Sequence, residues 1–345
     1  MGINENEINI NQKLIKRLGE LDSFNGYWPI LKKKIEHELG NLKHVSTIAS
    51  IGSSTRIEGV QMSDQEIDQF LDDINETSFL SRDKQEVLGY KELLDQIIES
   101  HDEIAINENL IKQLHKILLS HSSKDEFHLG YYKKFDNNVI AKKEGKEIGV
   151  VFKTTSPFNT PKEMETLLNW YNQANDIHPL IKCAVFIVHF LAIHPFQDGN
   201  GRLSRALTTL ILLKEGYSYA PYCSLESIIE ANKTNYYKAL RDTQKSFFKK
   251  INYEPWLDFF FESLKKQQTL LSEKGSLVTY TLTKTQKHIL EFAESVNAFQ
   301  NSDVSESLNM NKNTVKVNLK KLVDIKLLSK EGIGKGTWYK TINPY

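Results

Sequence analysis

The residues best suited to chemistry lie in one short run, from His194 to Arg205, which reads His-Pro-Phe-Gln-Asp-Gly-Asn-Gly-Arg-Leu-Ser-Arg. The run combines an imidazole that can accept a proton near neutral pH, a carboxylate suited to Mg²⁺, and two arginines. Arg202 and Arg205 are three residues apart, so on a helix they share one face and can contact the same polyphosphate. Together these side chains predict a site that binds a nucleoside triphosphate.

The backbone around the run is predicted to present amide groups to an anion. Residues 181–193 are mostly apolar and predict a buried helix, which Pro195 should end near His194. The stretch 199–201 is a Gly-Asn-Gly turn, and an apolar helical pattern begins at Arg202. The turn would therefore lie at a helix N-terminus, where free N–H groups and the helix dipole stabilise phosphate.

The run matches the motif H-P-F-x-[DE]-G-N-G-R-x-x-R of the Fic family at every specified position. The resemblance implies a mostly helical core and transfer of AMP from ATP to a protein hydroxyl group. It gives His194 the role of general base and Asp198 that of Mg²⁺ ligand. It also implies that ATP is bound by Gly199, Asn200, Gly201, Arg202, Leu203, Ser204 and Arg205.

Other interpretations of the same run stay open. The related Doc-type kinases replace the second glycine with lysine and bind ATP the other way round, so the retained Gly201 favours AMP transfer over phosphate transfer. A histidine after an apolar helix and a Gly-Asn-Gly turn can also be purely structural. Nucleotides such as UTP are not excluded, because the motif contacts phosphates. His189 is expected to be a core histidine and not a zinc ligand.

A second pattern, Ser54-x-x-x-Glu58-Gly59, precedes the first by about 140 residues. It resembles the inhibitory motif [ST]-x-x-x-E-[GN] of many Fic proteins, in the class that acts within one chain. A carboxylate at Glu58 could pair with Arg205 and deny that arginine to the γ-phosphate. The α-phosphate would then not be aligned for attack. The alternative is that Glu58 is a solvated residue at a helix end and Gly59 an ordinary helix stop.

The elements that would position these residues are mainly helical. A capping box of Ser63 and Glu66 marks the start of one helix. Helices are expected at roughly 8–20, 27–39, 42–54, 63–75, 83–100 and 107–120.

Residues 138–152 contain two β-forming stretches around a polar turn at 144–146 and predict a hairpin. In Fic proteins a hairpin in this place, the flap, lies over the active site. By that resemblance it would hold a segment of a target protein through main-chain hydrogen bonds near His194. The alternative is a purely structural hairpin.

The segment 228–240 resembles the Asn-…-Tyr-Tyr-x-x-Leu segment of many Fic proteins. Tyr236 is accordingly expected to stack on adenine, with Asn232 as a hydrogen-bond partner; the alternative is that the tyrosines pack their helix onto the core. A further helix is expected over 244–272, followed by a linker at 272–276.

The tail is expected to form a separate domain. Helices at 283–293, 303–308 and 312–322 followed by a glycine-tipped hairpin resemble the winged helix often attached to Fic proteins. Eight lysines but only two acidic residues lie between Lys312 and Lys340, which suits contacts with DNA phosphates. The absence of arginine from the third helix predicts weak specificity. A solvated face, or a protein-binding or dimerising domain, is the alternative.

Composition restricts the class of protein. The 345 residues include 44 basic and 44 acidic side chains, so no overall charge directs the chain to nucleic acid or membrane. Two cysteines, no signal peptide and no apolar run long enough for a bilayer predict a cytoplasmic protein without a membrane partner. A homodimer is implied by family resemblance alone.

The expected fold is mainly α, with a Fic-type helical core, a small flap hairpin and a C-terminal winged helix-turn-helix domain. The expected domains are 1–105 with the inhibitory motif, 106–272 as the catalytic core, and 280–345. The resemblance thus implies an autoinhibited protein adenylyltransferase that uses ATP and Mg²⁺ and modifies a Ser, Thr or Tyr hydroxyl of a target protein or of itself.

Two other functions stay open. One is the reverse reaction, removal of AMP by hydrolysis, in which Glu58 would position a water molecule. The other is a DNA-binding regulator whose core only senses nucleotide, although the intact His194 and Asp198 argue against it.

Overall fold

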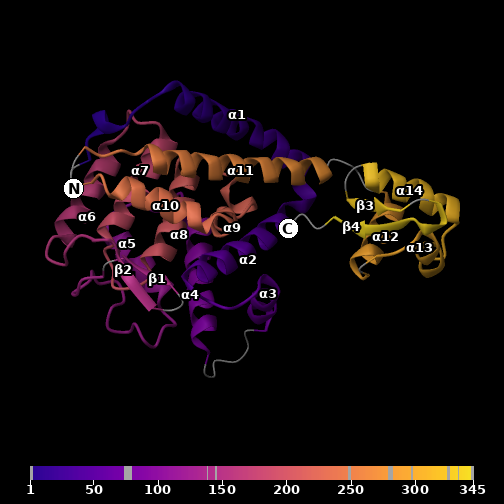
Figure 1. Cartoon of the computed structure of the whole chain (residues 1–345), viewed down its shortest axis with the longest axis horizontal. Coiled ribbons are helices and arrows are strands. Elements are labelled where there is room, and N and C mark those ends of the chain that lie inside the picture. The colour runs from indigo at the N-terminus through magenta and orange to yellow at the C-terminus, as the bar shows by residue number, and fades with distance from the viewer. Residues whose placement is uncertain are drawn as a thin grey trace. The chain divides into compact units, whose positions relative to one another are not determined.

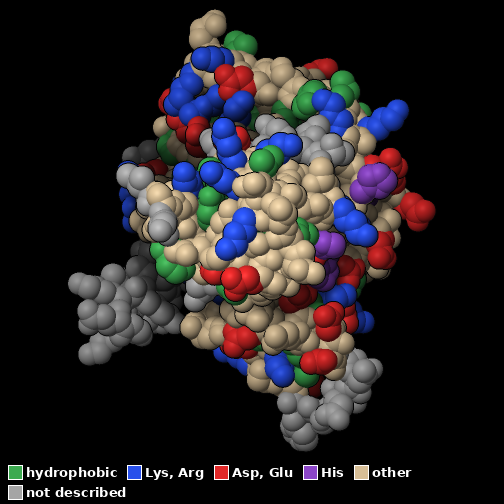
Figure 2. All heavy atoms as spheres, turned by 90° about the vertical axis from the view of Figure 1, so that its right-hand side faces the viewer, with side chains coloured by type: hydrophobic (Ala, Val, Ile, Leu, Met, Phe, Trp, Pro, Cys, Tyr) green, Lys and Arg blue, Asp and Glu red, His purple; other side chains and the backbone are tan. Residues whose placement is uncertain are grey.

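The structure is a computed structural model that describes residues 3–73, 80–137, 139–143, 146–247, 250–278, 283–296, 298–324, 327–332 and 334–342. Contacts divide the chain into two compact units, one of residues 1–30 and 39–270 and the other of residues 31–38 and 271–345. Figure 1 labels their elements. On the face drawn in Figure 2, Lys and Arg side chains are interspersed with Asp and Glu side chains, as expected for a chain without net charge.

Helices account for most of the larger unit. One 3-10 turn, η1 (Glu5–Glu7), precedes them, η2 (Glu36–Glu38) follows α1, and η3 (Ala220–Tyr222) follows α8. The helices are α1 (Gln12–Lys34), α2 (Leu39–Glu58), α3 (Asp64–Asp72), α4 (Arg82–Ser100), α5 (Glu108–Leu118), α6 (Thr160–Gln173), α7 (Pro179–Ile193), α8 (Asn200–Lys214), α9 (Leu225–Ala231), α10 (Lys233–Gln244) and α11 (Glu254–Val278).

The centre of this unit is the pair α7 and α8. Nearly every side chain of α7 is buried, as expected for a helix that is apolar on all sides. Helix α8 is also almost entirely buried, although its sequence is far more polar. It packs against α2, α4, α5 and α7, which lie around it in Figure 1. Because α8 contains two arginines, the surrounding helices must supply partners for buried charge.

Two predictions about the N-terminal helices are wrong. The expected helices 8–20 and 27–39 are one helix, α1, which continues through Pro29. Leu14, Leu21 and Trp28 are buried at helical spacing along it, so packing outweighs the local helix-breaking preference of proline. The expected helix 42–54 is longer, and α2 ends at Glu58.

The other early helices follow the sequence prediction. Helix α3 begins at the expected capping box of Ser63 and Glu66, and α4 and α5 lie within two residues of their predicted bounds. Residues 74 and 75, which were expected to end the helix that corresponds to α3, lie outside the described residues.

The stretch 272–276, expected to be a linker, follows the boundary between the two units at residue 270, but it is helical because these residues belong to α11. Serine, glutamate and lysine are compatible with a helix, and Gly275 alone costs only about 1 kcal/mol. The helix expected over 244–272 begins at Glu254 instead, since α10 ends at Gln244.

The predicted hairpin is confirmed. Strands β1 (Val139–Lys143) and β2 (Lys146–Phe152) pair antiparallel, with Val139 opposite Phe152 and two irregularities in register. The tip at 144–145 lies outside the described residues.

The C-terminal segment has the element order that the sequence predicts. Helix α12 (Lys284–Glu294) begins at a capping box, and α13 (Asn301–Ser307) and α14 (Lys312–Asp324) follow. Strands β3 (Leu328–Glu331) and β4 (Trp338–Thr341) then form an antiparallel hairpin that contains the turn η4 (Gly334–Gly336). Their shared core consists of Ile289, Ala293, Phe299, Val304, Val315, Leu319, Leu322, Leu328 and Tyr339.

No helix within the described ranges combines the length and the apolar character that crossing a membrane requires.

His189 is a core histidine, as the sequence predicts. Its side chain is 1% exposed, its Nε2 lies 2.8 Å from the Tyr253 hydroxyl, and its ring stacks on Phe247. Burial lowers the pKa of His189 to about 3. The imidazole is therefore neutral in the folded protein and becomes charged only on unfolding in mild acid.

This burial predicts acid sensitivity. Because the pKa of His189 is lower in the folded than in the unfolded chain, its contribution is complete above about pH 6.5 and is lost as pH falls towards 3. His189→Gln should flatten the fall in unfolding free energy over this window, by on the order of 4 kcal/mol at its lower end. Urea unfolding at several pH values measures this. His37→Gln, at an exposed position, should leave the change of unfolding free energy with pH as it is in the wild type. The same pH dependence in all three proteins would contradict the prediction.

Candidate active site

The loop between α7 and α8 carries the motif. Helix α7 ends at Ile193, and His194 follows in the left-handed conformation, with φ 53° and ψ 60°. Gly199, with φ 79°, precedes the first turn of α8, which begins at Asn200. The Gly-Asn-Gly turn therefore lies at a helix N-terminus, as the sequence predicts. Unpaired backbone N–H groups at such an end favour an anion.

His194 is held in one tautomer. Its Nδ1 lies 3.2 Å from the carbonyl oxygen of Leu191, and a carbonyl can only accept, so Nδ1 carries the hydrogen. The lone pair is then on Nε2, which can accept a proton. Burial lowers the pKa of His194 to about 4, and the positive charge of Lys133 acts in the same direction. The imidazole is accordingly neutral at pH 7.

The side chain of Asn200 forms two hydrogen bonds within the loop. Its Oδ1 accepts from the Phe196 N–H at 2.9 Å and its Nδ2 donates to the Phe196 carbonyl at 2.7 Å. Both polar atoms of the Asn200 side chain therefore already have partners in the loop. A contact from Asn200 to phosphate would come from its backbone.

His115, on α5, contacts the same loop. The sequence analysis did not identify this residue. It is fully buried, stacks on Phe196 with ring centroids 3.8 Å apart, and its Nδ1 accepts from the Gly130 N–H at 3.1 Å. Its Nε2 then donates to the carbonyl oxygen of Asp198 at 3.1 Å. Burial lowers the pKa of His115 to about 4, which keeps this tautomer neutral.

Asp198 has the chemistry of a Mg²⁺ ligand. Its Oδ1 accepts from the Gly199 N–H at 2.6 Å and lies 3.5 Å from Nη2 of Arg202, while the side chain is 37% exposed. Burial acts to raise the pKa of Asp198, but the Arg202 charge and the Gly199 hydrogen bond hold it below its usual value. Within the described residues no cluster of three or more metal-ligating side chains occurs. One ionised carboxylate together with substrate phosphates is nevertheless a common way of binding Mg²⁺.

The next residues of α8 are buried. Arg202 is 2% exposed, and its Nη1 donates to Glu86 at 3.1 Å, a partner on α4 that the sequence did not reveal. Leu203 lies in the core, and Ser204 Oγ donates to the Gly201 carbonyl. A contact of Leu203 with ATP could therefore involve only its backbone.

Arg205 is held by the predicted inhibitory motif. Its guanidinium, 4% exposed, donates from Nε to Ser54 Oγ (2.8 Å) and from Nη2 to the Ser54 carbonyl (2.9 Å) and Glu58 Oε1 (2.8 Å). Burial acts to raise the pKa of Glu58, but the charge and hydrogen bond of Arg205 hold it below its usual value. Glu58 is thus ionised and reaches the start of α8, where a methyl group at Gly201 would collide with its carboxylate.

Gly59 ends α2 with φ 114°, a conformation that favours glycine. Its N–H donates to the Arg56 carbonyl at 3.1 Å. Gly59 thus has the geometry of the helix stop, while Glu58 one residue earlier is not simply solvated.

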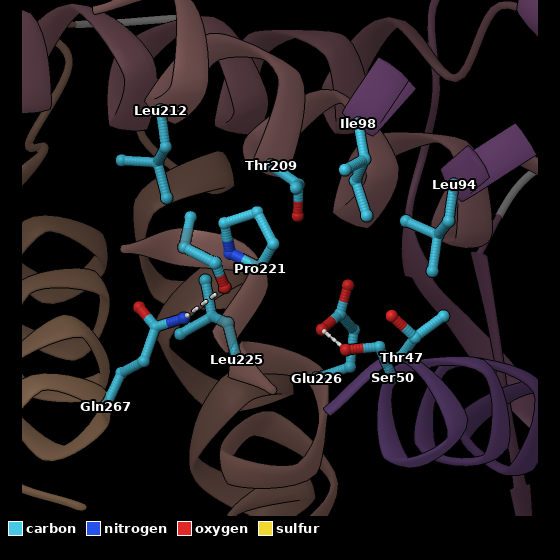
Figure 3. A pocket seen from close by; sticks show the side chains of 11 residues that line it. Thr47, Ser50, Leu94, Ile98, Thr209, Leu212, Pro221, Leu225, Glu226 and Gln267 are labelled. Carbon is cyan, nitrogen blue, oxygen red and sulfur yellow. Dashed lines mark hydrogen bonds between the residues drawn. The ribbon is translucent and has the colours of Figure 1, made fainter. Parts of the chain in front are cut away.

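A row of polar contacts docks α2 on α9. Ser50 Oγ donates to the buried carboxylate of Glu226 at 2.8 Å, and the two side chains meet in Figure 3. Burial raises the pKa of Glu226, which also accepts from Tyr90. Two turns further along α2, Arg56 donates to both carboxylate oxygens of Glu230, at 2.8 and 3.0 Å.

The end of α2 has two more attachments. Lys233 Nζ donates to the Ile57 carbonyl at 2.6 Å, and Arg56 also donates to Asp64 at the start of α3. The signal for the contacts of Arg56 with Glu230 and of Lys233 with Ile57 is weak in the sequence, because these partners lie about 175 residues apart.

Tyr236, the expected adenine contact, differs in exposure from its neighbour Tyr237. Tyr236 is 3% exposed and packs between Trp256 and Phe259, whereas Tyr237 is 41% exposed. Asn232 lies at the junction of α9 and α10, and its Nδ2 donates to the Ile228 carbonyl. The stacking role of Tyr236 stays a prediction, and Tyr237 is the more exposed of the two rings.

Comparison with known proteins identifies a family match within the larger unit. Residues 105–212 match the Fic/DOC family. A probable protein adenylyltransferase of Aquifex aeolicus is 32% identical over 97 residues, 28% of each chain. A protein adenylyltransferase of Caenorhabditis elegans, fic-1, is 27% identical over 131 residues, 35% of this chain and 26% of the relative. The chain thus spans about a quarter of the length of these relatives.

Solved structures share the fold. A Fic family protein from Desulfovibrio desulfuricans covers 98% of both chains with a TM-score of 0.64 at 20% identity. A Fic domain protein from Bacteroides thetaiotaomicron covers 75% of this chain and 96% of its own, with a TM-score of 0.60 at 22% identity. Residues 105–212 of this chain are thus similar to the Fic/DOC domain, and the chain shares the fold of these Fic proteins.

Proposed function

We propose that this protein is an autoinhibited adenylyltransferase that transfers AMP from ATP to a Ser, Thr or Tyr hydroxyl group of a protein. The observation that carries the proposal is the placement of a neutral His194, with its lone pair on Nε2, beside the N-terminus of α8. The curated relatives that match this region bear the name protein adenylyltransferase, which supports the same reaction.

The reaction requires little of the protein beyond alignment and one proton transfer. The target oxygen forms a bond to the α-phosphorus while the bond from that phosphorus to the bridging β-phosphate oxygen breaks, so pyrophosphate leaves. Nε2 of His194 takes the hydroxyl proton. The start of α8, with Arg202 and Arg205, binds the phosphate charges. Asp198 would hold Mg²⁺, which when bound neutralises phosphate charge.

Inhibition follows from competition for Arg205. Its guanidinium already donates to Glu58 and to Ser54, so it is not available to a γ-phosphate while α2 is in place. Glu58 also brings a negative charge to the start of α8, where phosphates would bind. ATP would therefore bind without its α-phosphate in line with the target hydroxyl.

The first prediction concerns Glu58. Glu58→Gly should raise incorporation of labelled AMP about 10- to 150-fold, the range expected on removing one charge-assisted hydrogen bond of about 1.5–3 kcal/mol. Intact-mass spectrometry after incubation with ATP would detect self-modification at the same time. The exposed Glu103→Gly is the matched control, and Glu58→Gly/His194→Ala should be inactive. Equal incorporation by wild type and Glu58→Gly would contradict the inhibitory role.

The second prediction concerns the docking of α2. Arg56→Ala removes the bidentate pair with Glu230 and should raise AMP transfer, because α2 is then released more often. The increase should disappear in the Glu58→Gly background, where inhibition is already lost. Arg17→Ala is a matched control, since Arg17 has the same 25% side-chain exposure and pairs with Asp258 far along the chain. Additive effects of Arg56→Ala and Glu58→Gly would argue against a shared mechanism.

We further propose that the target docks on the β1–β2 hairpin. The segments on either side of the hairpin expose large aromatic side chains, and exposed apolar groups of this size commonly mark protein-binding surfaces. These are Phe127 (86% exposed), Tyr131 (68%), Phe135 (69%) and Phe158 (92%).

A second function, DNA binding, is favoured by the surface of α14. Lys312, Lys316, Lys320 and Lys321 are exposed along this helix, and Val317, 55% exposed, could contact a thymine methyl group. The helix is the third of three and is followed by the β3–β4 hairpin, the order in which a winged helix presents its recognition helix.

DNA binding can be tested by a salt series. Lys316→Ala/Lys320→Ala should weaken retention of duplex DNA at every sequence tested and reduce the slope of log affinity against log salt by about 2. Lys284→Ala/Lys287→Ala on α12, where both lysines are also exposed, is the matched control. This variant should change the retention of DNA and the salt slope less. If the protein retains no duplex DNA even at low salt, the proposed DNA binding is wrong.

A further inference from the structure

Four consecutive carbonyl groups, those of residues 193–196, accept hydrogen bonds from the segment 133–137. Lys133 donates to the first from Nζ (3.0 Å) and to the third from its backbone N–H (2.8 Å). Nδ2 of Asn137 donates to the second (3.2 Å) and to the fourth. The backbone on both sides of His194 is therefore fixed from outside the catalytic motif.

Lys133 and Asn137 are themselves fixed by Thr154. The ammonium group of Lys133 has three donors, and beside the Ile193 carbonyl it contacts Asn137 Oδ1 (2.7 Å) and Thr154 Oγ1 (2.9 Å). The Thr154 hydroxyl donates in turn to Asn137 Oδ1 at 3.0 Å. Lys133 is 4% exposed and Thr154 6%, so water has little access to these bonds. Burial lowers the pKa of Lys133 to about 8, which leaves it mostly charged at pH 7.

These contacts lie at the base of the hairpin. Asn137 is two residues before β1, and Thr154 is two residues after β2. The Thr155 N–H also donates to the Ala192 carbonyl, in the last turn of α7. Both ends of the hairpin are thus bonded to the backbone that carries His194.

His194 needs such support because its backbone is unfavourable. A non-glycine residue in the left-handed region costs of order 1–3 kcal/mol and persists only where the surroundings enforce it. In an ordinary helical conformation the chain would continue α7, and the imidazole would point elsewhere. The conformation of His194 therefore decides whether Nε2 faces the site.

We propose that Lys133, Asn137 and Thr154 are positioning residues that form a clamp, which holds His194 ready for proton transfer and couples it to the hairpin. The proposal rests on the AMP transfer proposed above. One set of hydrogen bonds fixes both the hairpin and the backbone of His194. The hydroxyl group of a target strand that binds the hairpin would therefore be in register with His194, which takes its proton.

The kinetic test uses the Glu58→Gly protein, so that inhibition does not mask the effect. Thr154→Val keeps the side-chain shape and removes the hydroxyl, and it should lower kcat for AMP incorporation about ten-fold or more while KM for ATP stays within about two-fold. Thr154→Ser, the matched control, keeps the hydroxyl and should restore most of the activity. An unchanged kcat for Thr154→Val, or a Thr154→Ser protein as impaired as Thr154→Val, would overturn the clamp.

A second measurement does not depend on activity. The charged groups that face His194 are Lys133, Asp198 and Glu58. NMR titration of the His194 ring, assigned with His194→Ala, should show a higher pKa in Lys133→Met, by about half a unit or more, because a nearby positive charge is removed. Thr154→Val should move the ring signal without this pKa change. Signals identical to those of the parent in both variants would overturn the clamp, even if no AMP transfer were found.

Discussion

The structure depends on one buried charge. The guanidinium of Arg205 lies 4% exposed inside a helix that is covered on several sides, and a cation in such a place must be paired and hydrogen-bonded. In the described structure α2 meets this need through Ser54 and Glu58. Occupation of Arg205 by a carboxylate and occupation by a phosphate therefore satisfy the same requirement. A carboxylate of the same chain can for that reason occupy the position at Arg205 that a phosphate would otherwise take.

The motif and its backbone could be predicted from the sequence, because the information is local. Pro195 and the two glycines determine where α7 ends and α8 begins, and the spacing of Arg202 and Arg205 determines that they share a helix. Pairing of Glu58 with Arg205 required the family resemblance, since nothing else connects residues 147 positions apart. Failures occurred where packing outweighs a local rule: α1 passes through Pro29 because its apolar stripe continues, and α11 passes through Gly275.

The supporting residues were not predictable for a different reason. His115, Lys133 and Glu86 are ordinary residue types without periodic spacing, and each gains its role from a partner between 60 and 116 residues away. Buried polar groups of this kind are required by the satisfaction of hydrogen bonds, which depends on the complete fold. The sequence therefore indicates which atoms could react, while the structure shows which atoms hold them in place.

The way in which α2 is attached is compatible with the release that the proposed autoinhibition requires. Its buried residues include Ser46, Ser50, Ser53, Ser54 and Thr55, so much of the docked surface is small and polar. Release of this surface also exposes the buried Ile48, Ile51 and Ile57, but water can replace its hydrogen bonds, each of which contributes only about 0.5–1.5 kcal/mol net when neither partner is charged. A docked face made only of leucine would bury more apolar area and bind α2 more tightly. Under the proposed autoinhibition, the balance between closed and open states would depend on a few charged pairs at the end of the helix, where Arg56 meets Glu230 and Glu58 meets Arg205.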